Sequence, residues 1–273
     1  MKVIRAHPVV TMFVLAYGLT WVVWVPRAAG VDMGLVGRLW TWAPAVAALV
    51  TAALLGKPAL HEWSARLVRW RVRWYWYVSV VLAPAAFSVA VAGCYALLGA
   101  SWTAALPWMA TPVPLLPLLL LVLTMTDGLG EEPAWRGFAL PRVLQRHGVL
   151  SASLVVGIFW ALWHLPLLWT PGIGDSQLPW WLLILDVPAK SVFFTWVFRR
   201  TDGSVLLAAL FHGATNLFVV SPSEAIAHDL TLPVLATAAK WVLIGAILLA
   251  VRRPAVRGPS PDTDPESRRC RSA

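Results

Sequence analysis

The chain has 273 residues, of which 59% are hydrophobic and only 13% are charged. A soluble domain carries about 25% charged residues, so this composition excludes an ordinary soluble protein and predicts an all-α, polytopic membrane protein. The net charge of +9 would suggest a nucleic-acid partner in a soluble protein. In a membrane protein it favours basic residues that fix the topology, and no nucleic-acid partner is expected.

Apolar segments long enough to cross a bilayer recur along the whole chain. A transmembrane helix needs roughly 20 apolar residues. We expect eight such helices, at 8–26, 35–55, 76–99, 116–140, 149–170, 179–198, 204–220 and 233–251. They would form one transmembrane domain over residues 1–252. The remaining residues, 253–273, are rich in Pro, Ser and charge, and are expected to be a disordered cytoplasmic tail.

Lys and Arg are distributed very unevenly between the segments that join these helices. With a cytoplasmic N-terminus, most of them fall in the inner segments, whereas the outer segments hold only Arg27 and Arg38. Cytoplasmic loops of membrane proteins are enriched in Lys and Arg. Both termini are therefore predicted to be cytoplasmic. The Arg- and Trp-rich segment 56–75 is expected to be a basic helix at the membrane interface.

The fourth predicted helix contains charged residues in the stretch TMTDGLGEEPAWRGFALPR. An ionisable side chain costs on the order of 3 kcal/mol at a bilayer centre, so it is placed there for partners or chemistry. Either Glu131 or Glu132 could act as a general base, and Arg136 could pair with Glu132 four residues earlier. The alternative is that the two acids mark the cytoplasmic end of the helix. Asp127 either joins the site or caps a break in the helix.

Two histidines lie in later predicted helices. His164 ends a run without charged residues, and Trp160 stands one turn earlier on the same helical face. His212 and Asn216 are also four residues apart, so an imidazole and a carboxamide could together bind a developing oxyanion. Such residues can also be purely structural. Two acids and two histidines facing one interior are, however, the parts of a water-activating hydrolase site.

Asp186 and Lys190 form a further pair with helical spacing in the sixth predicted helix. A neutralising structural ion pair between helices is favoured over catalysis here. Lys240, in the last helix, is expected to pair or to extend its amine to the membrane surface.

The three motifs in this order resemble the CPBP (Abi) family, which includes the type II CAAX prenyl endopeptidases. They read EEPAWR (131–136), WALWH (160–164) and HGATN (212–216), within a matching segment of about 115–220. The second motif of the family usually begins with Phe. Trp160 takes that place here and is expected to alter packing rather than chemistry.

The resemblance implies an intramembrane endopeptidase with an eight-helix core. Glu131 would activate water as the general base, and His164 would help to hold that water. His212 and Asn216 would form the oxyanion hole. The supporting residues would be Glu132 and Arg136. The expected substrate is a membrane-associated peptide or protein, cleaved at the cytoplasmic side of the lipid bilayer.

The cofactor and the function each keep an alternative. Glu131, His164 and His212 are plausible zinc ligands, although no HExxH motif is present. A metal-independent route through glutamate-activated water is favoured, with zinc as the alternative. The alternative function is a non-catalytic immunity or scaffold protein that retains the fold. A transporter with a proton relay is disfavoured by the order of the motifs.

Overall fold

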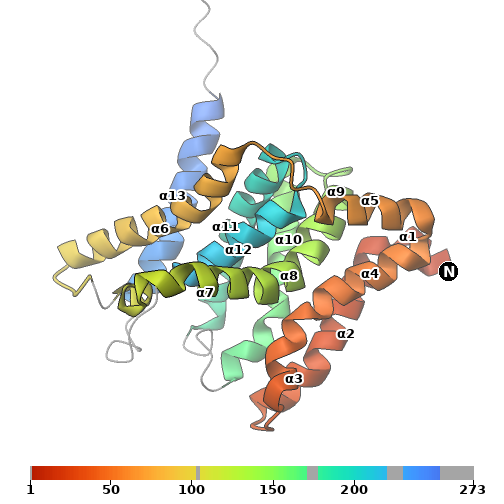
Figure 1. Ribbon diagram of the computed structural model, residues 1–273, viewed down its shortest axis with the longest axis horizontal. Coiled ribbons are helices and arrows are strands. Elements are labelled where there is room, and N and C mark those ends of the chain that lie inside the picture. The colour runs from red at the N-terminus through yellow and green to blue at the C-terminus, as the bar shows by residue number, and fades with distance from the viewer. Residues whose placement is uncertain (1, 103–104, 171–177, 220–229, 253–273) are drawn as a thin grey trace, which may run out of the picture.

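The computed structural model describes residues 2–102, 105–170, 178–219 and 230–252. The predicted tail, residues 253–273, lies outside them. The α-helices are α1 (Lys2–Ala6), α2 (Pro8–Ala28), α3 (Gly34–Leu39), α4 (Ala43–Leu55), α5 (Lys57–Leu67), α6 (Trp74–Leu97), α7 (Leu116–Leu123), α8 (Leu129–Ala134), α9 (Leu140–Val143), α10 (Val149–Trp163), α11 (Trp180–Arg200), α12 (Val205–Leu217) and α13 (Thr231–Arg252). Figure 1 shows their arrangement.

Short helical segments of other types join them. The 3₁₀ turns are η1 (Trp40–Trp42), η3 (Pro107–Ala110), η4 (Val113–Leu115) and η7 (Leu165–Trp169). Two π-helical segments are η5 (Thr124–Gly128) and η6 (Trp135–Ala139).

Six of the described helical segments are long and apolar enough to cross a membrane. They are Pro8–Ala28, Trp74–Leu97, Val113–Val143, Val149–Trp169, Trp180–Arg200 and Thr231–Ala250. The second and seventh predicted spans correspond to shorter apolar helices, Trp40–Leu55 and Val205–Leu217. The prediction of an all-α polytopic membrane protein is confirmed. The second predicted span is divided, because α3 and η1 precede α4, which begins with a proline in its first turn.

Helix α12 lies in the middle of the molecule and packs against α6, α7, α8 and α11 (Figure 1). The Ser204 hydroxyl caps its start by accepting a hydrogen bond from the backbone N–H of Leu207 at 3.2 Å. Its buried face carries small residues, among them Ala208, Ala209 and Gly213. Small residues let helix backbones approach closely in membrane proteins, so α12 can be surrounded on several sides.

The segment Val113–Val143 runs through α7, η5, α8, η6 and α9 without a break. Both π segments contain an i→i+5 hydrogen bond, from Leu129 N–H to Thr124 O and from Leu140 N–H to Trp135 O. Such wide turns occur mostly as single insertions at functional sites. Here the two π segments enclose the α-helical turn that carries Glu131 and Glu132.

Side chains from other elements satisfy carbonyl groups near these π segments. The Trp63 indole donates to Pro133 O at 2.9 Å, and Arg66 Nη1 donates to Gly137 O at 3.2 Å. A buried carbonyl without a partner would be costly, so these donors help to stabilise the irregular helix. Helix α5 thus holds the chain on both sides of the start of η6.

Glycines bring neighbouring backbones directly against the same segment. A Cβ on Gly213 would stand 2.8 Å from the Thr124 nitrogen, and a Cβ on Gly130 would stand 2.5 Å from the Thr41 oxygen. Neither position can accept a side chain without a shift of backbone. The close approach fixes α12 and η1 against the turn that carries the two acids.

Candidate active site

Glu131 lies in α8 and is only 3% exposed. Its Oε2 accepts hydrogen bonds from the indole N–H groups of Trp160, at 2.6 Å, and Trp135, at 3.2 Å. No hydrogen bond within the described residues reaches Oε1, which faces Nε2 of His212 at 4.0 Å. One carboxylate oxygen is therefore held and the other is left for chemistry. Trp160 does more than fill space, which differs from the sequence-based expectation.

Glu132 points to a different set of partners. Its Oε1 accepts from Arg136 Nη1 at 3.0 Å and lies 2.8 Å from Nδ1 of His212. Glu132 and Arg136 are both fully buried, as the i,i+4 spacing allowed. The Arg136 guanidinium lies 4.4 Å from the ring centroids of Trp160 and Phe194. These contacts hold Arg136 and His212 in place, so Glu132 supports the site from behind.

The contact with Glu132 also orients the His212 ring. Because a carboxylate only accepts hydrogen bonds, Nδ1 carries the proton in this contact and Nε2 is turned to Glu131. The imidazole thus bridges the supporting acid and the candidate base.

His164 caps the end of α10 and is half-buried. Its Nδ1 lies 2.9 Å from the backbone oxygen of Trp160. A carbonyl oxygen only accepts, so Nδ1 carries the proton and Nε2 keeps its lone pair. Pro166 stands in the first turn of η7 and helps to end the α-helix here. His164 consequently reaches the site from a helix end rather than from mid-helix.

Asn216 stands one turn beyond His212 but is exposed. Its Nδ2 donates to Oδ2 of Asp127 at 2.9 Å. Asp127 lies inside η5 in a continuous helix, so it does not cap a break. The carboxamide and Asp127 form the outer edge of the cluster, whereas Glu131 lies within.

The structure thus brings side chains from three separate predicted spans into one cluster. The Glu131 carboxyl group lies within electrostatic range of His212, His164 and Asp127. Sequence reasoning missed Trp135 and Phe194. The i,i+4 spacing of Glu131 and Trp135 could have revealed the first. Nothing in the local sequence points to Phe194, which arrives from α11.

The predicted zinc ligands do not fit a metal site. Among the described residues, no group of three or more His, Cys, Asp or Glu is arranged to hold a metal ion. Oε2 of Glu131 is occupied by two indole donors, and Nδ1 of His212 is bound to Glu132. Zinc requires several converging lone pairs, and this donor set offers mainly anchored ones.

The remaining ionisable cluster lies elsewhere, between α11 and α13. Asp186 accepts from Lys190 at 2.8 Å and from Lys240 at 2.6 Å, and it also binds the Thr237 hydroxyl at 2.9 Å. As predicted, this acid forms an ion pair that links helices. Lys240 pairs with it rather than extending to a membrane surface.

Comparison with known proteins places this cluster in a recognised context. Residues 113–218 match the family model described as type II CAAX prenyl endopeptidase Rce1-like. The chain is also 32% identical over 143 residues to CAAX prenyl protease 2 of Methanococcus maripaludis, a match that covers 50% of this chain and 49% of that protein. The match thus spans about half the length of this curated relative. The predicted resemblance to the type II CAAX prenyl endopeptidases is therefore confirmed over the segment that carries the candidate site.

Proposed function

We propose that this chain is an intramembrane endopeptidase that hydrolyses a peptide bond with water activated by Glu131. The observation that carries the proposal is the environment of that carboxylate. Two indole donors hold Oε2, and Oε1 faces Nε2 of His212 at 4.0 Å. Two polar atoms more than about 3.5 Å apart are suited to a bridging water. The family match over residues 113–218 supports peptidase chemistry at this place.

In the proposed reaction the water donates hydrogen bonds to Glu131 Oε1 and His212 Nε2, so its lone pair points to the substrate. The water oxygen attacks the carbonyl carbon of the scissile peptide bond while Glu131 accepts one proton. The electron pair of the C=O bond moves to its oxygen. When this tetrahedral intermediate collapses, the C–N bond breaks and Glu131 returns the proton to the leaving nitrogen. The products are a new carboxyl group and a new amine.

The oxyanion needs a donor that the resting cluster leaves free. A carboxamide carries two N–H groups, and Asp127 occupies one from Asn216. The second N–H is assigned to the oxyanion, as the family resemblance implies. His164, with a lone pair on Nε2, helps to hold the water. The substrate is a membrane-associated peptide or protein, and the bilayer is the second partner.

Glu131→Gln tests the proposal, because it keeps the size of the side chain and removes the base. Purified protein in detergent should cleave a panel of membrane-anchored peptides, and the variant should turn over at least about 100-fold more slowly. Glu62→Gln is the matched control, because Glu62 is exposed and binds only Arg66 within α5. Wild-type turnover by the Glu131 variant would refute the assignment.

A non-catalytic scaffold is the alternative that the buried Glu132–Arg136 pair favours, since such a pair can serve only to join helices. The two functions differ in what Glu131 does. A scaffold would lose thermal stability with Glu131→Gln and keep its biological effect. The proposed enzyme should lose turnover while its melting temperature changes little, because Gln still accepts from both indoles.

A further inference from the structure

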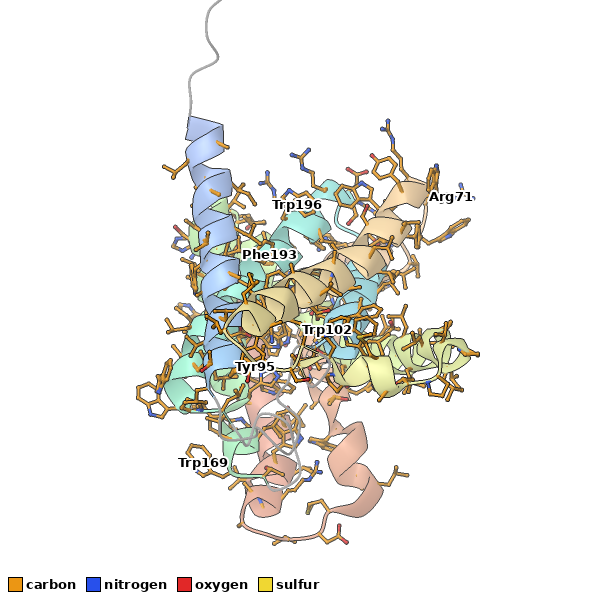
Figure 2. All side chains as sticks on the ribbon, turned by 90° about the vertical axis from the view of Figure 1, so that its left-hand side faces the viewer. Arg71, Tyr95, Trp102, Trp169, Phe193 and Trp196 are labelled. Carbon is orange, nitrogen blue, oxygen red and sulfur yellow. The ribbon has the colours of Figure 1, made fainter. Side chains whose placement is uncertain are left out.

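The two ends of this helix bundle differ in charge and in how they cover the site. Figure 2 shows Arg71 and Trp196 towards the end at which α13 finishes, and Trp169 towards the opposite end. Trp169 closes η7, the turn that follows His164. The acid–histidine cluster therefore has one neighbour end rich in arginine and one that is poor in it.

Polar contacts close the arginine-rich end. Arg66 donates to Gly137 O at 3.2 Å, Arg69 donates to Asp202 O, and the Ser204 hydroxyl donates to Arg69 O at 2.6 Å. These bonds tie α5 and the residues after it across η6 and across the start of α12. The chain on this side of Glu131 is also covered, because residues 130–140 are all buried.

Exposure returns only on the opposite side of Glu131 within this helix. Asp127 and Thr126 are half-buried and Met125 is exposed. Asn216 is exposed at the far end of α12, and His164 is half-buried at the far end of α10. Every polar group through which water or a peptide can approach the base therefore lies towards the arginine-poor end.

A cavity is found at the same end of the molecule. It has a volume of about 550 Å³ and is lined by residues that include Arg27, Asp32 and Thr170. Thr170 directly follows η7. Trp24, one turn before Arg27, has its ring 6.4 Å from that of His164. The hollow thus lies beyond His164, on the side where the cluster is open.

Lys and Arg mark the cytoplasmic side of membrane proteins. We propose that the site opens to the extracytoplasmic face, so that its substrates are exported peptides or outward-facing segments of membrane proteins. This rests on the proposed peptidase function and names its substrate class. It reverses the sequence-based expectation of cleavage at the cytoplasmic side. A cytoplasmic C-terminal segment would meet the closed end of the bundle.

Cysteine labelling in intact bacterial cells tests this directly. The background is the full chain with Cys94→Ser and Cys270→Ser, and the probe is a membrane-impermeant sulfonated maleimide. Asn216→Cys and Val219→Cys report on the opening, because both positions are exposed at the end of α12. Asp32→Cys and Arg146→Cys are references for the two ends, and both are exposed.

We expect Asp32→Cys, Asn216→Cys and Val219→Cys to react equally in intact and permeabilised cells. Arg146→Cys should react only after permeabilisation. The proposal is overturned if Asn216→Cys and Val219→Cys follow Arg146→Cys, or if Arg146→Cys reacts in intact cells. The labelling needs no activity and should be the same in a Glu131→Gln background. Cleavage in detergent has no sides, so its failure would instead refute the peptidase function.

Discussion

The indole N–H of Trp160 donates a hydrogen bond to Oε2 of Glu131 over 2.6 Å, between two helices that are 29 positions apart in the chain. Trp135 gives the same oxygen a second, longer bond of 3.2 Å from within the Glu131 helix. Together they decide which carboxylate oxygen faces His212. A hydrogen bond to a charged group contributes about 1.5–3 kcal/mol, so the loss of either donor should be measurable.

Replacing Trp160 by Phe should lower kcat by about tenfold or more and leave KM nearly unchanged, because only the orientation of the base is lost. Phe keeps an aromatic ring against Arg136. Steady-state kinetics on a cleavable peptide would show the split. Trp163→Phe is the control, since it removes a buried indole donor of the same helix that binds the Thr20 hydroxyl at 2.8 Å. Equal loss of kcat in both variants would make the Trp160 bond merely structural.

Replacing Arg136 by Met should destabilise the protein by about 3–5 kcal/mol, because it leaves the buried Glu132 carboxylate without its guanidinium. Thermal unfolding of the purified protein in detergent measures the effect. Adding Glu132→Gln to Arg136→Met should restore part of the stability, since the unpaired charge is then gone. If the double variant melts no higher than the single one, the pair is not coupled in this way.

Replacing Gly213 by Ala should cost about 1–3 kcal/mol through overpacking, because the new methyl group would meet the backbone of Thr124. The same change at Gly18, in α2, is the control, since a Cβ there meets nothing within 4 Å. It should be neutral or slightly stabilising. Melting curves of the two variants that coincide would show that α12 does not pack as closely as described.

Removing metal ions should leave turnover unchanged. The candidate donors are already engaged by indole, carboxylate and backbone partners, so the proposed chemistry uses the protein's own groups. Purified enzyme should be assayed after dialysis against a chelator, beside a mock-dialysed sample. Activity that disappears on chelation and returns with Zn²⁺ would contradict this expectation.

Much of the architecture follows from local patterns. Apolar stretches mark the helices, and the i,i+4 spacing of Glu132 and Arg136 predicts their ion pair, which the structure contains. The start of α12 at Ser204 likewise follows from a short side chain that can accept from a nearby N–H. These features depend on residues within about one helical turn.

Other features depend on residues far away in the chain and are invisible to local patterns. The sequence specifies an indole at position 160 but not the direction of its N–H, which is set by packing against Arg136 and Phe194. The π segment η6 is supported by Trp63, which donates to Pro133 from 70 positions earlier. The exposed placement of Asn216 likewise depends on η5 lying beside the end of α12.

The two π segments also limit how the length of this helix can change. An α-helix turns by about 100° per residue, and each wide turn inserts one residue into that progression. Deleting a single residue such as Met125 would let the first wide turn close into an ordinary α-helical one. Everything after it would then rotate by about 100°, and Glu131 would leave His212 although every motif residue remained. Substitutions in this segment are therefore graded in effect, whereas a one-residue deletion changes the phase of the whole site.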